Sequence, residues 1–118
     1  MQQKRKGLIR IYFATRYSLK GLKAAFLSEA AIRQELFAMA ILVPIIFICN
    51  VTNAERAVML MSLAIVLISE LLNTAVEKLS DHVSTDMHDL IGKAKDIGSA
   101  AVFISLLLAT AVWLIILL

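Results

Sequence analysis

The chain has 118 residues, of which 60% are hydrophobic, and its formal net charge is +3. A mean hydropathy of +0.83 lies far above that of an average soluble domain, and the length leaves no room for a separate soluble nucleotide-binding domain. Eight of the twelve Lys and Arg residues lie within residues 1–33, and this basic start next to apolar segments indicates an anionic membrane surface as partner rather than nucleic acid.

Residues 7–28 have the pattern of an amphipathic helix. One helical side would carry apolar residues, namely Leu8, Ile11, Tyr12, Leu19, Leu22 and Phe26. Another side would carry basic residues, namely Arg16, Lys20 and Lys23. Such a helix is expected to lie on the membrane face with its apolar side in the interface.

Three apolar segments follow, at residues 30–51, 55–79 and 97–118. The first contains Pro44 and reaches spanning length only with polar residues at both ends, whereas the third has 22 residues without a charge. The third begins with small residues, Gly98 among them, that permit close approach of a neighbouring helix. Gly92 is expected to break the polar link 80–96, with Ser84 or Thr85 capping a short helix, and Trp113 is expected to anchor the far interface. The sequence predicts a single all-α membrane domain, residues 1–118, with three transmembrane helices and an N-terminal surface helix.

The distribution of basic residues predicts how these spans are oriented. The region before the first span is strongly basic, and the second link carries Lys78, Lys93 and Lys95. The positive-inside rule therefore places the N-terminus and the second link in the cytoplasm and the C-terminus outside.

Glu70 lies in the middle of the second apolar segment, where a carboxylate costs about 2.5–3.5 kcal/mol on insertion scales. On a helix that advances about 100° per residue, Asn73, Glu77 and Asp81 fall on the same side as Glu70. This polar stripe runs from membrane depth to the membrane surface. It suits a reaction between an apolar and a water-soluble substrate.

Several carboxylates are expected near the cytoplasmic interface: Glu29, Glu35, Glu70, Glu77 and Asp81. Carboxylates with an amide supply the hard oxygen ligands of a magnesium–nucleotide site and a base for an attacking hydroxyl. The alternative interpretation is structural, with Glu70 paired to a basic residue of another helix and the outer acids as ordinary interfacial residues. Asp81 fits the structural interpretation better.

Two further clusters leave alternatives open. Lys93 and Lys95, before Gly98, could hold phosphate at a helix start or cap a cytoplasmic helix end, and no Walker P-loop is present. His82 and His88 are six residues apart, a spacing that does not match a common zinc site.

Four motifs together resemble the prokaryotic diacylglycerol kinases, and the resemblance covers nearly the whole chain. They are Ser18-Leu-Lys-Gly-Leu-Lys-Ala-Ala25, Glu29-Ala-Ala-Ile-Arg33-Gln-Glu35, Glu70-Leu-Leu-Asn73-Thr-Ala-Val-Glu77 and Ala94-Lys-Asp96-Ile-Gly-Ser-Ala-Ala101. The resemblance implies a bacterial inner-membrane enzyme that works as a homotrimer with sites shared between subunits. It implies transfer of the γ-phosphoryl group of ATP, with Mg²⁺, to diacylglycerol, which gives phosphatidic acid.

The resemblance also implies roles for individual residues. Glu70 matches the general base, Asn73 a polar residue that supports the base, and Glu29 and Glu77 the acids that bridge magnesium. Positions that match nucleotide contacts are Arg10, Tyr17, Glu29, Glu77, Asp86, His88, Lys95 and Asp96. Positions that match contacts to the lipid are Arg10, Ala14, Leu19, Lys23, Phe26, Ala31, Arg33, Glu35, Arg56, Glu70 and Ser99.

Three rival hypotheses accompany this prediction. An undecaprenol kinase of the same family would share the acidic core, although the segments 33–35 and 96–99 resemble the diacylglycerol type more. A small transporter subunit would use Glu70 as a proton relay and would not use ATP. A purely structural membrane module would need Glu70 and Glu77 only for stability.

Overall fold

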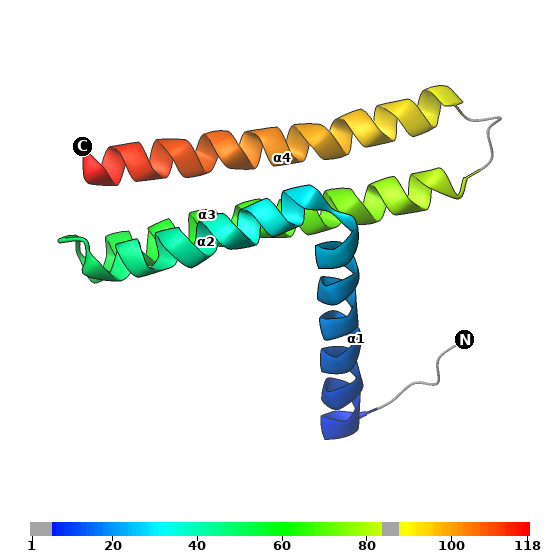
Figure 1. The fold of residues 1–118 in the computed structure, drawn as a ribbon, viewed down its shortest axis with the longest axis horizontal. Coiled ribbons are helices and arrows are strands. Elements are labelled where there is room, and N and C mark those ends of the chain that lie inside the picture. Colours follow the sequence, from blue (N-terminus) through cyan, green and yellow to red (C-terminus); the bar gives the residue numbers. More distant parts are fainter. Residues whose placement is uncertain (1–5, 84–87) are drawn as a thin grey trace.

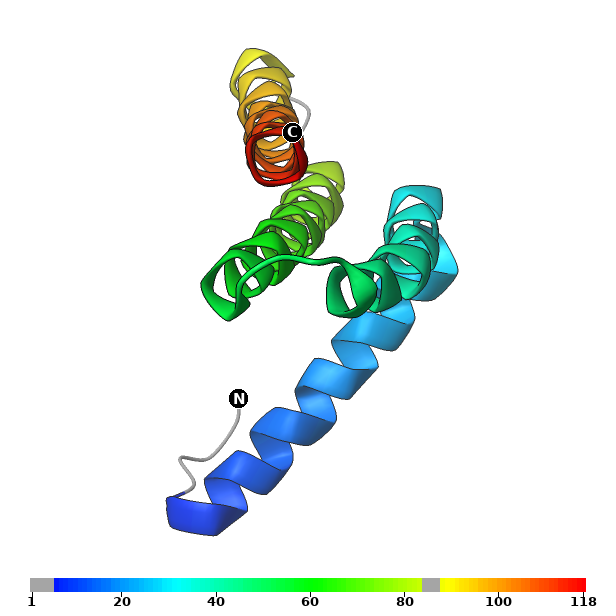
Figure 2. The same ribbon diagram turned by 90° about the vertical axis from the view of Figure 1, so that its left-hand side faces the viewer.

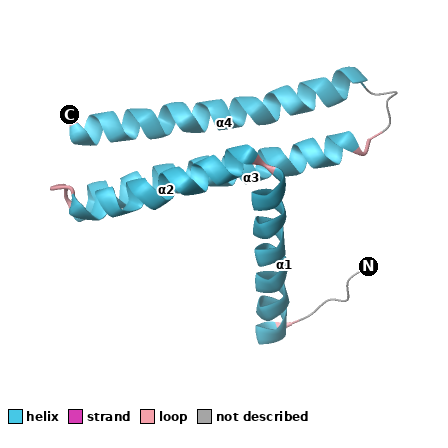
Figure 3. Ribbon diagram, viewed as in Figure 1, coloured by secondary structure: helices cyan, strands magenta, loops and turns pink. Residues whose placement is uncertain are grey.

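The computed structural model describes residues 6–83 and 88–118, without the side chain of His88. These residues form four helices, α1 (Gly7–Ser28), α2 (Ala30–Ile48), α3 (Asn53–Asp81) and α4 (His88–Leu117), and the described residues contain no strand (Figures 1 and 3). The stretches Ala30–Ile48, Asn53–Asp81 and Asp89–Leu117 are long and apolar enough to cross a membrane. The predicted all-α class with three membrane-spanning helices is therefore confirmed.

The helix α3 is the centre of the bundle. The helix α4 runs back along α3, α2 packs on another side of α3, and α1 projects crosswise from the three long helices (Figures 1 and 2). A single residue in an extended conformation, Glu29, separates α1 from α2. The chain therefore turns abruptly from the surface helix into the first span, beside the second half of α3.

The end of the α3–α4 link differs from the prediction. The helix α4 begins at His88 and continues through Gly92, so the predicted break at Gly92 is wrong. A glycine inside a helix costs only about 1 kcal/mol relative to alanine, and packing along α3 offsets that cost. The caps predicted at Ser84 and Thr85 lie outside the described residues.

The turn between α2 and α3 is fixed by one arginine. Arg56 donates from Nε to the carbonyl of Ile46 at 2.9 Å, and from Nη2 to the carbonyls of Cys49 at 3.1 Å and Val51 at 3.3 Å. Its Nη1 donates to Oδ1 of Asn53 at 2.6 Å. The last carbonyls of a helix lack partners within the helix, and where they are partly buried they need other donors. Arg56 supplies those donors.

Replacing Arg56 with alanine is expected to lower the free energy of unfolding by about 1.5–3 kcal/mol, because partly buried carbonyls lose a charged donor. Thermal unfolding in detergent micelles, followed by circular dichroism, measures the loss. Lys20→Ala removes a cationic side chain that is exposed on α1 and serves as the control. Equal melting temperatures for the two variants would contradict this role of Arg56.

The main core cluster lies at the end of the bundle that carries this turn. Ile46 of α2 packs with Met59 and Leu63 of α3, and Trp113 of α4 adjoins them. Trp113 donates from Nε1 to Oγ of Ser62 at 3.1 Å, and the Ser62 hydroxyl donates to the Met59 carbonyl at 2.7 Å. Trp113 therefore joins α4 to α3 through its polar atom, and its role as an interfacial anchor stays a prediction.

Candidate active site

The polar stripe on α3 is present as the sequence predicts. Glu70, Asn73 and Glu77 are all half-buried, and Nδ2 of Asn73 donates to Oε1 of Glu77 at 3.0 Å. Residues four apart on a helix are neighbours on one side, which allows this bond. The amide thereby fixes the direction of the Glu77 carboxylate.

Two acids from outside α3 join this stripe. The charges of Glu77 and Glu29 both act on Glu70, and the charge of Glu70 acts on Glu35. The four residues Glu29, Glu35, Glu70 and Glu77 are called the acid cluster below. Because like charges repel strongly at partly buried positions, the cluster favours a bound cation.

The acid cluster fits magnesium only together with a nucleotide. Among residues 6–83 and 88–118, no group of three or more His, Cys, Asp or Glu side chains is arranged to hold a metal ion. Magnesium, however, is usually held by one or two protein carboxylates, phosphate oxygens and water rather than by an all-protein cage. Glu29 and Glu77 supply hard oxygen donors of the required kind.

The α1–α2 corner places Glu29. Glu29 has φ −122° and ψ 118°, and its side chain caps neither helix by hydrogen bonding. Its Oε2 lies 4.0 Å from Nζ of Lys78, the residue directly after Glu77. Arg33 holds the corner from the other side, donating from Nη1 to the carbonyls of Phe26 at 2.7 Å and Leu27 at 3.2 Å. Arg33 therefore binds the end of α1 in this structure.

Lys95 brings the beginning of α4 to the acidic end of α3. Its Nζ donates to Oδ1 of Asp81 at 2.8 Å, and its charge also acts on Glu77. Asp96, the next residue, is exposed, and so is Ser99, three positions further along α4. A positive charge is thus available next to the acids, where phosphate oxygens would need it.

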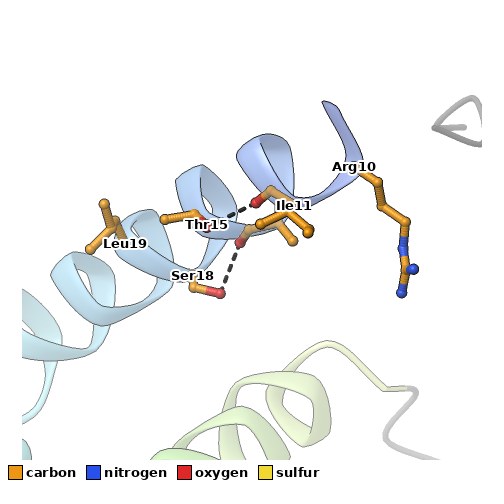
Figure 4. Close-up of a pocket in the computed structure, with 6 residues that line it drawn as sticks. Arg10, Ile11, Thr15, Ser18 and Leu19 are labelled. Carbon is orange, nitrogen blue, oxygen red and sulfur yellow. Dashed lines mark hydrogen bonds between the residues drawn. The ribbon is translucent and has the colours of Figure 1, made fainter. Parts of the chain in front are cut away.

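The surface helix α1 carries a shallow pocket of about 340 Å³ (Figure 4). Its lining residues are Arg10, Ile11, Ala14, Thr15, Ser18 and Leu19. Thr15 and Ser18 donate their hydroxyls to the carbonyls of Ile11 and Ala14, and the Arg10 side chain extends away from the helix in Figure 4. This pocket unites the predicted contacts Arg10, Ala14 and Leu19.

Other predicted site residues are not brought to the acid cluster. Arg56 lies fourteen residues before Glu70 on α3, about 21 Å along the helix axis, and binds the α2–α3 turn. Tyr17 and Lys23 lie on exposed positions of α1, where the Lys20 ammonium is 6.0 Å from the Tyr17 ring centroid. Phe26 and Ala31 lie close to the corner. Asp86 and the side chain of His88 lie outside the described residues.

Three residues at the site were missed or set aside from the sequence. Asp81 was assigned a structural role and does pair with a lysine, but that lysine comes from α4 and is a predicted nucleotide contact. Lys78 approaches Glu29. Its position directly after Glu77 was the feature of the sequence that could have placed it at the site. Gly98 adjoins Asn73, and the small residues that open the third span already indicated a close approach there.

Three spanning helices with an acid cluster around the central one define a small integral-membrane protein with a polar site between its helices. The chain belongs to the prokaryotic diacylglycerol kinase family, whose family model matches residues 16–117. Its sequence is 46% identical over 110 residues to the diacylglycerol kinase of Haemophilus influenzae, with 93% of each chain covered. It is 47% identical over 112 residues to that of Pseudomonas aeruginosa, with 95% of this chain and 91% of the relative covered.

The diacylglycerol kinase of Escherichia coli K12 is 42% identical over 113 residues, with 94% of this chain and 91% of the relative covered. These matches confirm the predicted family and the predicted class of enzyme, a membrane kinase. They favour that class over the transporter subunit and the structural module.

Proposed function

We propose that the protein phosphorylates diacylglycerol to phosphatidic acid with ATP at the cytoplasmic face of the bacterial inner membrane. One observation carries the proposal: Glu70 stands on a membrane-length helix within reach of the charges of Glu29 and Glu77. A base at that depth can meet a lipid hydroxyl, while the outer acids can meet a water-soluble nucleotide. The names of the relatives support diacylglycerol as the lipid.

Glu70 is the proposed general base. The hydroxyl oxygen of the lipid attacks the γ-phosphorus of ATP, and the bond between that phosphorus and the β–γ bridging oxygen breaks. The proton of the hydroxyl passes to a carboxylate oxygen of Glu70, and ADP leaves with the bridging oxygen. A positioned base contributes about 10²- to 10⁴-fold to such a transfer.

Glu29 and Glu77 are the proposed magnesium ligands. When bound, Mg²⁺ would neutralise charge on the phosphates. Asn73 directs Glu77 through its hydrogen bond, which supports this role. Lys95 would leave its hydrogen-bond partner Asp81 and donate to a phosphate oxygen instead. The other proposed contacts to the nucleotide follow from the family resemblance and are Arg10, Tyr17, Asp86, His88 and Asp96.

An apolar pocket of about 320 Å³ between α2, α3 and α4 is the proposed site of an acyl chain. It is lined by Glu35, Ala38, Leu42, Leu63, Val66, Leu106, Ala109, Thr110 and Trp113. Glu35 lines this pocket and is close enough to Glu70 for the two charges to act on each other. A lipid whose polar end lies at Glu70 could therefore extend its acyl chain into the pocket. The other proposed lipid contacts are Ala14, Leu19, Lys23, Phe26, Ala31, Arg33, Arg56 and Ser99.

The proposal includes the orientation and the oligomer. The basic residues of α1 support a cytoplasmic N-terminus and an external C-terminus. A homotrimer with shared sites is proposed from the family resemblance. The large apolar surface of the single chain, on α4 for example at Phe103, Ile104 and Ile115, is available for lipid and for neighbouring copies.

Transfer of ³²P from [γ-³²P]ATP in mixed micelles tests the function. Purified protein is given diacylglycerol, undecaprenol or no lipid, and the labelled product is identified by chromatography. We expect labelled phosphatidic acid and a kcat/KM for diacylglycerol at least about tenfold above that for undecaprenol, a difference of about 1.4 kcal/mol. A preference for undecaprenol would assign the protein to the polyprenol substrate instead, and no labelled lipid at all would overturn the kinase proposal.

A further inference from the structure

Gly98 on α4 lies directly against Asn73 on α3. A Cβ atom added at Gly98 would overlap Oδ1 of Asn73, and Cγ of Asn73 would lie 3.4 Å from it. The same addition at Gly21 or at Gly92 would meet nothing within 4 Å. Among the helical glycines, Gly98 is thus the position where an added side chain would take the space that a site residue, Asn73, occupies.

The Asn73 side chain is held in one orientation. Its Nδ2 donates to Oε1 of Glu77 at 3.0 Å, which directs Oδ1 toward α4. That oxygen is fully buried and has no hydrogen-bond partner among the described residues. A buried acceptor without a partner costs about 1–3 kcal/mol, so this arrangement persists only where the surrounding structure imposes it. The α4 backbone at Gly98 lies directly against this oxygen.

We propose that Gly98 is a positioning residue: its missing side chain lets α4 press the Asn73 amide into the orientation that directs the Glu77 carboxylate. The inference rests on the proposed function, because it gives Glu77 a metal–nucleotide task. Carboxylates that ligate metals are themselves held by hydrogen bonds, and loss of such a partner typically costs about 10- to 100-fold in metal affinity or activity. Asn73 is that partner, and Gly98 is what holds Asn73.

The first experiment compares Gly98→Ala with Gly92→Ala, two identical substitutions six residues apart in α4. We expect Gly98→Ala to raise the Mg²⁺ concentration for half-maximal activity about tenfold or more, with the KM for lipid unchanged. Gly92→Ala is expected to leave both values as in the wild type, since its new methyl group meets open space. Equal Mg²⁺ dependence in the two variants, with an active wild type, would overturn the inference; an inactive wild type would instead overturn the proposed function.

The second experiment needs no turnover and separates positioning from general helix packing. In ¹⁵N-labelled, metal-free protein, the side-chain amide signal of Asn73 is expected to shift in Gly98→Ala and to stay in place in Gly92→Ala. In an Asn73→Ala background, which removes the competing atoms, Gly98→Ala is expected to keep or raise the melting temperature, because alanine favours the helix more than glycine does. An unshifted Asn73 signal, or a lower melting temperature for the double variant than for Asn73→Ala, would overturn the inference. This comparison stays decisive even when Gly98→Ala alone does not fold.

Discussion

Replacing Glu70 with glutamine is expected to lower kcat for diacylglycerol phosphorylation by about 10³-fold, because an amide cannot take the proton of the lipid hydroxyl. Glutamine keeps the size and polarity of the side chain, so the helix packing around α3 should stay as it is. The KM values for ATP and for lipid are expected to remain within about threefold of wild type, since the lost interaction belongs to the transition state. Initial rates at saturating lipid and Mg–ATP measure both quantities.

Glu55→Gln is the matched control for this experiment. Glu55 lies on the same helix and forms a capping box with Thr52, in which Oε1 of Glu55 accepts from the Thr52 amide at 2.9 Å. Glutamine can fill the same capping position, so both stability and activity should stay near wild type. A Glu70→Gln enzyme with a kcat within about threefold of the control would contradict the role of Glu70 as the general base.

Replacing Glu77 with glutamine is expected to raise the Mg²⁺ concentration for half-maximal activity by about 10- to 100-fold. The substitution removes a negative charge from the acid cluster and replaces a strong oxygen donor by a weak one. Glu29→Gln should change the Mg²⁺ dependence in the same direction, because Glu29 supplies the second proposed ligand.

Chelation with EDTA is expected to abolish transfer by the wild type, and added Mg²⁺ should restore it.

Titration of activity with Mg²⁺ at fixed ATP distinguishes this role from a structural one. A variant that is only less stable would lose activity at every Mg²⁺ concentration and would not recover at high Mg²⁺. Wild-type Mg²⁺ dependence in both Glu77→Gln and Glu29→Gln would contradict the assignment of the metal to these acids.

The helices and the stripe on α3 could be predicted because their signals are local. Apolar length and amphipathic periodicity indicated the helices, and the period of 3.6 residues placed Asn73 and Glu77 beside Glu70. The continuation of α4 through Gly92 could not be predicted in this way. It depends on packing along α3, which overrides the weak helix propensity of one glycine.

The remaining parts of the site depend on contacts between helices. That Glu29 and Glu35 approach Glu70 follows from the abrupt corner after α1 and from the packing of α2 on α3. The contact between Gly98 and Asn73, and the bond from Trp113 to Ser62, fix how α4 lies along α3. A single sequence gives the periodicity of each helix but not the register between two helices. The grouping of Glu29 with Glu70 and Glu77 was therefore expected from the family resemblance, whereas Asn73 as the partner of Gly98 and Ser62 as the partner of Trp113 were not foreseen.

The most direct test of the proposed site places a paramagnetic metal in it. Mn²⁺ with a non-hydrolysable ATP analogue is added to protein with ¹³C-labelled glutamate side chains, and broadening of each carboxyl signal reports its distance from the metal. We expect strong broadening of the Glu29, Glu70 and Glu77 signals, while Glu55, at the opposite end of α3, keeps its signal. Sharp signals from Glu29 and Glu77 in the nucleotide complex, or broadening of Glu55 in their place, would contradict the proposed site.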